Sequence, residues 1–424
     1  MVRSRVLNRR RSTVVGLAAL LAGVALTGGP ASAAPATRTG ELQRTAQGVV
    51  DAGAVGYLVR VNDGDRVRTA TAGLADRDTG RRLKNKDQYE AGSQTKTFVA
   101  VLVLQLVAER KVALDAPIEK YLPGVVPNGA DITVRMLLQH TSGLFNYTED
   151  AGLISQALTQ PYTPIAVEDI LKAAFSHPPN FAPGTDWSYS NTGYIVLGEL
   201  LTKVTGQPVT QLVDRRITRP LHLRDTYFAD PFPGTIGPGY AHGYIADLSV
   251  DPPEYVDTAG WTLSWAGSAG AIVSTTRDLS TFYSSLLAGK VLPKAQLAQM
   301  QKTKDDIEEF GGFGGYGLGL YWMETPCGRV WGHDGATLGN SSTTFTTADG
   351  GRTYATDTTT RLYAADPADP RLETFAFAYS EAQVTAMCGM FGQEVPSAVA
   401  KVKASVWPQR ISEVGPLGFT SGGW

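Results

Sequence analysis

Ser93 and Lys96 form an S-x-x-K motif just before a long apolar stretch. Three positions along a helix place both side chains on one face. A serine hydroxyl is a poor nucleophile at neutral pH and needs a base held against it. A lysine buried beside it can serve, because desolvation lowers the pKa of an ammonium group. The same motif also fits a helix N-cap serine followed by a solvated lysine.

A second group, Tyr189-Ser190-Asn191, follows the loop at Pro183-Gly184 and directly precedes a helical pattern. A tyrosine with a depressed pKa could carry a proton between the nucleophile and the leaving group, and an asparagine amide could orient both the lysine and a substrate amide. The structural alternative is a turn with an asparagine cap.

A third group, His333-Asp334-Gly335, follows the strand pattern Arg329–Gly332. The glycine would let a substrate backbone approach the strand edge closely, whereas the plainer interpretation is a strand end with a surface histidine. The five histidines show no ligand spacing, so neither a metal nor another cofactor is expected. His140 is expected to be a structural loop residue rather than a catalyst.

The elements that must position these groups begin with a buried strand over Gly53–Val61 and its hairpin partner over Arg66–Ala72. The stretch Phe98–Val107 is apolar nearly all round, which predicts a helix buried in the core. Ser93 would lie at the N-terminus of that helix, where the helix dipole stabilises developing negative charge. The region from about 115 to 253 reads as helices, such as Val167–Phe175 and Thr192–Val204, joined by Pro- and Gly-rich loops.

Strand patterns return late in the chain, and a short helix follows them. The predicted strands are Tyr316–Trp322, Arg329–Gly332, Ser342–Thr347, Thr353–Thr359 and Phe375–Tyr379, and the predicted helix is Ala382–Met387. Strands at both ends with helices between them predict an α+β fold, in which an antiparallel sheet built from both termini is flanked by helices and carries a mainly helical insertion over about 115–253. The expected catalytic domain covers 34–395, followed by a peripheral tail over 396–424.

The N-terminus has the pattern of a cleaved signal peptide over residues 1–33. Arginines between 3 and 11 precede an apolar run over Val14–Leu26, and Ala31-Ser32-Ala33 supplies small residues for cleavage. The alternative, a membrane span, would need about 20 apolar residues. A secreted protein is therefore expected, and the even cysteine count, Cys327 and Cys388, then suggests one disulfide rather than two separate thiols.

The composition narrows the class of partner. Apolar residues make up 43% of the 424 positions and charged residues 18%, which fits a globular protein with a large core. The formal net charge of −2 provides no basic field for nucleic acid. A small molecule or peptide is the expected partner, and the protein is expected to be a monomer.

The three groups in this order resemble the serine β-lactamase and penicillin-binding protein superfamily, whose motifs are S-x-x-K, S-D-N and K-T-G. The variants Y-S-N and H-D-G are similar to its class C β-lactamase and low-molecular-mass DD-peptidase branch, which includes secreted actinomycete D-alanyl-D-alanine carboxypeptidases. The resemblance covers nearly the whole mature chain. Its landmarks include Tyr121-Leu122-Pro123-Gly124, His140-Thr141-Ser142-Gly143-Leu144, Ser264-Trp265-Ala266 and Gly315-Tyr316-Gly317-Leu318-Gly319-Leu320.

The resemblance implies a serine hydrolase that works through an acyl-enzyme on a small peptide or amide, for which a peptidoglycan stem peptide is a candidate. β-Lactams are candidate acylating inhibitors, but the sequence does not decide penicillin sensitivity. The implied catalytic roles are Ser93 as nucleophile, Lys96 as its partner, Tyr189 as main proton carrier, Asn191 as lysine and substrate contact, and His333 in place of the third-motif lysine. The backbone N–H groups of Ser93 and Ala336 would form the oxyanion hole. Trp265 and Gly335 are expected to contact substrate, and the two cysteines fall where such relatives have a disulfide.

The sequence departs from the carboxypeptidases where they grip the substrate's terminal carboxylate. Tyr321 stands in place of an arginine, and Asp334 and Ala336 replace two hydroxyl residues. An ionised Asp334 would repel a carboxylate by about 4 kcal/mol at a separation of about 4 Å and an effective dielectric constant of about 20. The substrates could then be D-amino-acid amides, esters, or peptides whose amine pairs with Asp334. The alternative keeps carboxypeptidase activity with a relocated carboxylate ligand.

Three rival functions remain open to different degrees. A non-catalytic penicillin-binding sensor is disfavoured because an idle site need not keep Ser93, Lys96 and Tyr189. A β-lactamase cannot be separated from a peptidase by family likeness, since the two differ in how fast water attacks the acyl-enzyme. An α/β-hydrolase esterase is disfavoured because the chain has no persuasive G-x-S-x-G elbow between strand and helix.

Overall fold

The computed structural model describes residues 35–229, 231–233, 239–305, 307 and 312–396. The expected signal peptide, and the tail beyond residue 396, lie outside the described residues. Within the described part of the chain, no helix is long and apolar enough to cross a membrane.

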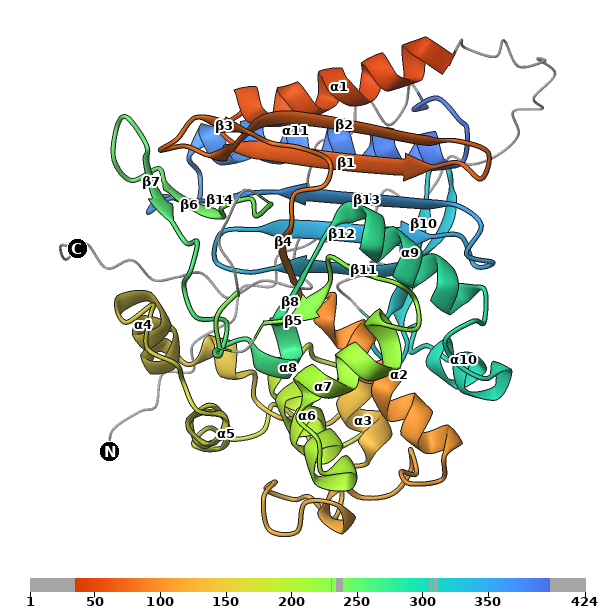
Figure 1. Ribbon diagram of the computed structural model, residues 1–424. Coiled ribbons are helices and arrows are strands. Elements are labelled where there is room, and N and C mark those ends of the chain that lie inside the picture. Colours follow the sequence, from red (N-terminus) through yellow and green to blue (C-terminus); the bar gives the residue numbers. More distant parts are fainter. Residues whose placement is uncertain (1–34, 230, 234–238, 306, 308–311, 397–424) are drawn as a thin grey trace, which may run out of the picture. The chain divides into compact units, whose positions relative to one another are not determined.

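An eight-stranded antiparallel sheet contains strands from both ends of the chain, in the order β3-β2-β1-β13-β12-β11-β10-β9 (Figure 1). The α+β class and the two-ended sheet predicted from the sequence are therefore confirmed. The strands are β1 (Gly56–Asn62), β2 (Val67–Asp76), β3 (Arg81–Arg82), β9 (Gly314–Tyr316), β10 (Tyr321–Thr325), β11 (Gly328–Ala336), β12 (Ser341–Thr346) and β13 (Thr353–Thr358).

Helices cover both faces of this sheet. Helices α1 (Pro35–Asp51) and α11 (Pro370–Met390) contact each other and lie against β1, and α9 (Thr276–Leu287) contacts β12 and β13. Figure 1 shows α9 in front of the sheet and α11 behind it. Because successive residues of a strand point to opposite faces, each strand contributes side chains to both layers.

Helix α11 corrects one sequence prediction. The predicted strand Phe375–Tyr379 and the predicted helix Ala382–Met387 both lie inside this single helix. Asp369 caps it by accepting a hydrogen bond from the Arg371 N–H at 2.9 Å, and Pro370 occupies the first turn. Phe375 and Tyr379 are four residues apart, so they lie on one helix face, where their rings stack with centroids 6.1 Å apart.

The predicted strand Tyr316–Trp322 is also wrong in its continuity. The chain reverses over residues 317–320, so that β9 and β10 pair as a hairpin with Tyr316 opposite Tyr321. Gly319 permits this reversal because its φ is +77°, and a Cβ there would lie 2.5 Å from the Ala100 side chain.

The second layer of the fold is helical and surrounds α2 (Thr95–Ala108), whose side chains are buried on nearly every face. This agrees with the prediction from its all-round apolar pattern. Around it lie α6, α7, α8 and α10. The helices of this layer are α3 (Val134–Gln139), α4 (Ala151–Thr159), α5 (Val167–Phe175), α6 (Asn191–Thr205), α7 (Val209–Val213), α8 (Gly267–Gly270) and α10 (Lys294–Met300).

Two small sheets, ordered β4-β8-β5 and β14-β6-β7, connect the layers. Their strands are β4 (Tyr89–Gly92), β5 (Tyr227–Phe228), β6 (Tyr244–Asp247), β7 (Glu254–Asp257), β8 (Ile272–Ser274) and β14 (Thr360–Tyr363). Strands β5 and β6 lie inside the region expected to be mainly helical. The expected disulfide is present between Cys327 and Cys388, and it ties the β10–β11 turn to α11.

Candidate active site

Ser93 lies in the two-residue turn between β4 and α2. Thr95 fixes this turn, since its hydroxyl donates to the Gly92 carbonyl at 2.7 Å and accepts from the Ile272 N–H at 2.9 Å. Strand β11 passes directly beside it. A Cβ on Gly335 would lie 2.0 Å from the Ala91 carbonyl oxygen, so only glycine allows this approach.

The expected oxyanion-hole groups are brought together by this packing. A Cβ built on Gly92 would lie 2.6 Å from the Ala336 nitrogen, and one built on Gly335 would lie 2.8 Å from the Ser93 nitrogen. The backbone of Ser93 and that of Ala336 therefore border the same point, at the N-terminal end of α2. Backbone N–H groups and the helix dipole both favour negative charge there.

Lys96 is fully buried, and its amine has three oxygen neighbours. Its Nζ lies 2.6 Å from Asn191 Oδ1, 2.8 Å from the Ala269 carbonyl oxygen and 3.0 Å from Ser93 Oγ. Burial lowers the pKa of Lys96 well below its usual value, although nearby Asp334 opposes the shift. A neutral amine has two N–H groups and one lone pair. The amide oxygen and the carbonyl oxygen can only accept, so they take the N–H groups and leave the lone pair to the Ser93 hydroxyl.

Asn191 is the first residue of α6 and holds the lysine. Its Oδ1 accepts from Lys96, while its Nδ2 donates to Asn146 Oδ1 and to Thr148 Oγ1, each at 3.2 Å. Both N–H groups of the amide thus have protein partners, and the expected substrate contact of Asn191 stays a prediction. Asn146 and Thr148 were missed at the sequence level, where the only available signal was their position shortly after the His140 landmark.

Tyr189 completes the catalytic group. Its ring centroid lies 4.9 Å from Lys96 Nζ, and its buried hydroxyl makes no hydrogen bond within the described part of the chain. Burial raises the pKa of Tyr189 well above its usual value, and nearby Ser93 lowers it by less. The hydroxyl is therefore protonated at neutral pH, contrary to the depressed pKa that we expected from the sequence.

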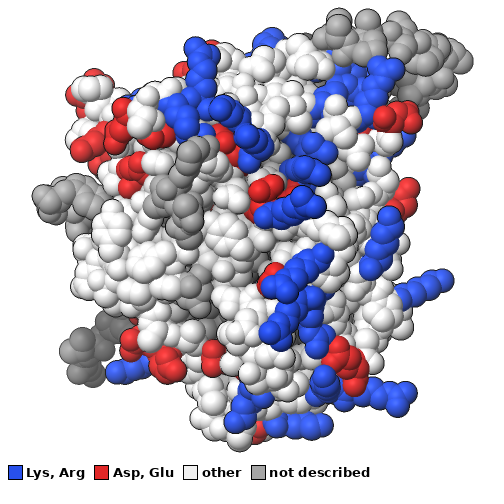
Figure 2. Space-filling view, viewed as in Figure 1, with Lys and Arg blue, Asp and Glu red and all other residues white. Residues whose placement is uncertain are grey.

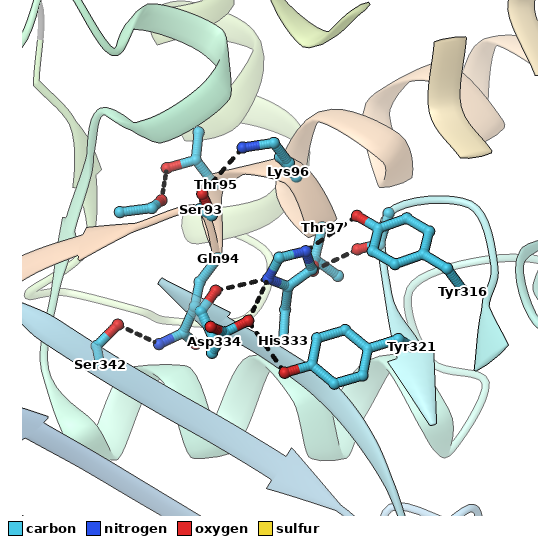
Figure 3. A network of polar contacts seen from close by, with 12 residues as sticks. Ser93, Gln94, Thr95, Lys96, Thr97, Tyr316, Tyr321, His333, Asp334 and Ser342 are labelled. Atoms are coloured by element: carbon cyan, nitrogen blue, oxygen red, sulfur yellow. Dashed lines mark hydrogen bonds and ion pairs between the residues drawn. The ribbon is translucent and has the colours of Figure 1, made fainter. Parts of the chain in front are cut away.

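His333 is buried on β11, and both of its ring nitrogens have partners. Its Nδ1 lies 2.5 Å from the Asp334 carbonyl oxygen, which can only accept, so Nδ1 carries the hydrogen. Nε2 then accepts from the Tyr316 hydroxyl at 2.9 Å (Figure 3). Burial lowers the pKa of His333 to about 4. The imidazole is neutral at pH 7, so it does not supply the positive charge of the lysine whose place it takes.

The other residues predicted to contact substrate differ in their burial and in their protein contacts. The Tyr321 hydroxyl donates to Asp334 Oδ1 at 3.0 Å (Figure 3), so the two residues that replace the carboxylate-binding arginine and hydroxyl contact each other. Trp265 is 4% exposed and belongs to the apolar core around α2, just before α8. Its expected role in substrate binding stays a prediction.

Beyond this site, the described surface carries charges of both signs. On the face in Figure 2, Lys and Arg side chains are interspersed with Asp and Glu. A wide part of the same face carries no charged side chains. Among the described residues, no group of three or more His, Cys, Asp or Glu side chains could hold a metal ion. The arrangement at Ser93 is the one expected of a serine hydrolase whose nucleophile lies beside a buried lysine.

Comparison with known proteins agrees with this class. The Beta-lactamase family matches residues 42–375, and the chain belongs to that family. The family is part of the β-lactamase and penicillin-binding protein superfamily, whose members are serine hydrolases. The curated relative esterase EstB from Burkholderia gladioli is 35% identical over 201 residues, which cover 45% of this chain and 50% of the esterase. The chain spans about half to two thirds of the length of the curated relatives that it matches.

Two solved structures match over almost their full length. A D-stereospecific amidohydrolase from Streptomyces sp. has a TM-score of 0.72 and 35% identity, covering 83% of this chain and 99% of that one. The D-amino acid amidase from Ochrobactrum anthropi SV3, complexed with L-phenylalanine amide, has a TM-score of 0.70 and 25% identity, with the same coverage.

Proposed function

We propose that this protein is an amidohydrolase that cleaves D-amino-acid amides and D-amino-acid-containing peptides without requiring a free C-terminal carboxylate. The observation that carries the proposal is the Tyr321–Asp334 hydrogen bond, which puts a phenol and an acid where a D-alanyl-D-alanine carboxypeptidase is expected to hold a cation and a hydroxyl. The names of the two similar solved structures point to the same substrate class.

Acylation would begin at Ser93. The Lys96 lone pair takes the hydroxyl proton as Oγ bonds to the substrate carbonyl carbon, and the carbonyl oxygen becomes an oxyanion beside the N–H groups of Ser93 and Ala336. Protonated Tyr189 then gives its proton to the amine nitrogen as the C–N bond breaks, and the Lys96 ammonium returns a proton to Tyr189. The products are an ester on Ser93 and a free amine.

Deacylation reverses these proton transfers with water in place of the amine. Water attacks the ester carbonyl carbon and gives a proton to the Tyr189–Lys96 pair. That proton passes to the Ser93 oxygen as its bond to the carbonyl carbon breaks, which restores the hydroxyl and releases the carboxylic acid. General acid–base catalysis of this kind contributes about 10²- to 10⁴-fold in rate. No cofactor enters either half of the cycle.

The test is a paired hydrolysis assay. An N-acylated D-Ala-D-Ala peptide is compared with its C-terminal amide, and D-alanine or D-alaninamide is quantified, with D-phenylalanine amide as a third substrate. The proposal expects faster cleavage of the amides, and Ser93→Ala as a folded, inactive control. Faster cleavage of the free acid would instead establish a carboxypeptidase with a relocated carboxylate ligand.

Ester hydrolysis is a second candidate, favoured by the 35% identity to esterase EstB over 201 residues. An alkoxide is a better leaving group than an amine anion, so the same Ser93 site would cleave esters with less help from the Tyr189 proton. Comparing D-phenylalanine methyl ester with D-phenylalanine amide would rank the two activities by kcat/KM.

We also propose that the protein is exported. The pattern of residues 1–33 supports this, and so does the disulfide, because disulfides persist outside the reducing cytosol. N-terminal sequencing of protein recovered from the medium should begin at Ala34. Retention of the intact N-terminus inside the cell would overturn this proposal.

A further inference from the structure

A cavity of about 680 Å³ is lined by strands of the large sheet on one side and by α11 on the other. Its volume falls in the range of small-molecule sites. We call it the α11 cavity. Its walls include Tyr321, Asp334, Phe345, Tyr354, Phe375 and Tyr379.

The α11 cavity lies on the opposite face of β11 from the catalytic lysine. His333 is paired with Thr344, and Asp334 is paired with Thr343, which lines the cavity. Because consecutive strand residues point to opposite faces, β11 turns Asp334 toward the cavity and Gly335 toward the Ser93 turn. The strand that borders the nucleophile is therefore also a cavity wall.

The cavity face of β11 and the face toward the Ser93 turn meet at an open edge of this strand. The last pair between β10 and β11 joins Tyr321 to Gly332. Within the described part of the chain, residues 333–336 pair with β12 but with no strand on their other side. A substrate extended along this edge would have its acyl group at Ser93 and would pass its leaving group toward Asp334.

The charged groups of the cavity wall are mainly acidic. They are Asp334, Asp369, Glu373 and Arg361. Asp369 forms an ion pair with Arg371 at 2.7 Å, and Arg361 donates to the Thr337 carbonyl at 3.1 Å. Three carboxylates thus face two guanidinium groups, Arg361 and Arg371, which leaves one net negative charge beside the aromatic walls. Carboxylates and aromatic faces together attract an organic cation.

We propose that the α11 cavity is a leaving-group subsite that takes a primary ammonium group carried on an apolar stem. The proposal rests on the amidohydrolase function and specifies its preferred leaving group. The ammonium group would pair with Asp334, and the stem would pack against the rings of Tyr354 and Phe375. The bonds made and broken at Ser93 remain those of amide hydrolysis.

A matched pair of substrates tests the subsite. D-Phenylalanine is joined through its carboxyl group to 1,6-diaminohexane in one and to heptylamine in the other, so the two differ only in the terminal charge. At low ionic strength the cationic substrate should have about tenfold higher kcat/KM. That ratio should fall to about one in Asp334→Asn and in Ala376→Trp, which fills the cavity from α11, but not in the exposed control Glu254→Gln. A wild-type ratio near one, with both substrates hydrolysed, would overturn the subsite and leave the amidohydrolase function standing.

Binding without turnover provides an independent readout. Calorimetry on Ser93→Ala should detect hexylammonium but not hexanol, and adding Asp334→Asn should weaken hexylammonium binding about tenfold. Failure of the wild type to hydrolyse D-phenylalanine amide would overturn the proposed function, whereas this binding would still support the subsite. If Ser93→Ala does not bind hexylammonium, or binds it equally well without Asp334, the subsite is wrong.

Discussion

The imidazole of His140 lies against the phenol ring of Tyr189, with ring centroids 4.3 Å apart and planes tilted by 35°. His140 also holds the backbone on both sides of that tyrosine. Its carbonyl accepts from the Ser188 N–H at 3.1 Å, and its Nδ1 accepts from the Ser190 N–H at 3.2 Å. Burial lowers the pKa of His140 well below its usual value, so its imidazole is neutral. Because Nδ1 accepts from Ser190, the single ring hydrogen lies on Nε2. His140 is therefore a positioning residue for Tyr189.

Replacing His140 should impair proton donation by Tyr189 more than nucleophilic attack. His140→Ala is expected to lower kcat for an amide by up to about 100-fold, because small displacements of a catalytic group have effects of that size. A p-nitrophenyl ester needs little proton donation and should lose much less. His140→Asn should recover part of the loss, because asparagine tolerates the left-handed backbone, with φ of 62°, and offers an acceptor to Ser190. Equal losses for amide and ester would contradict the positioning role.

Lys96 should be needed as a neutral amine. Because burial lowers its pKa, kcat/KM should rise with pH as Lys96 loses its proton and then level off well below the pH at which an ordinary lysine titrates. Lys96→Arg cannot lose its proton and should reduce kcat/KM by about 10³-fold or more, within the range of general-base effects. Circular dichroism would verify the fold of the variant. Activity within tenfold of the wild type would rule out Lys96 as the base.

The sequence indicated the catalytic group better than its surroundings. Ser93 and Lys96 are three residues apart at a helix start, so local geometry alone predicts their contact, and the order of motifs adds Tyr189. The contact of Asn191 with Asn146 spans 45 residues, and nothing local predicts such a pairing. The Tyr189 pKa could not be predicted either, because its direction depends on burial by distant segments.

The fold prediction failed where aromatic residues occur in short runs. Phe375 and Tyr379 fit a strand by composition, but Asp369 and Pro370 just before them begin a helix that continues to Met390. The spacing of apolar residues alone does not distinguish a short buried strand from a segment of helix. The α11 cavity could not be foreseen, because it requires the pairing of β11 with β12 and the placement of α11 over them.

Neutral His333 should make stability depend on pH in a defined window. Its folded-state pKa is lowered to about 4, against about 6.5 in the unfolded chain. Between these values the unfolded state binds the proton and the folded state does not, so stability falls as pH falls from 6.5 to 4 by roughly 3 kcal/mol. The His333→Gln variant lacks this titratable imidazole. Urea unfolding of both proteins should therefore show the wild type losing more stability than the variant across the window, and parallel curves would contradict a neutral buried His333.

Asp357 should make stability depend on pH in the opposite direction. It is fully buried on β13, and its Oδ2 accepts from Asn340 Nδ2 at 3.1 Å. Burial raises its pKa well above the usual value, although the Asn340 hydrogen bond opposes the shift, and nearby Glu90 raises the pKa further. As pH rises from about 4, the unfolded chain releases this proton while the folded chain retains it, so the stabilisation present at low pH is lost.

Asp357→Asn preserves the shape of the side chain and removes its titration. The variant should therefore gain stability relative to the wild type as pH increases from 4 to 8, as measured by urea unfolding at each pH. Asp51→Asn provides a matched control, because Asp51 is exposed at the end of α1, where its carboxylate accepts from Gln47. A constant difference between Asp357→Asn and the wild type across this range would contradict a raised pKa of Asp357 in the folded protein.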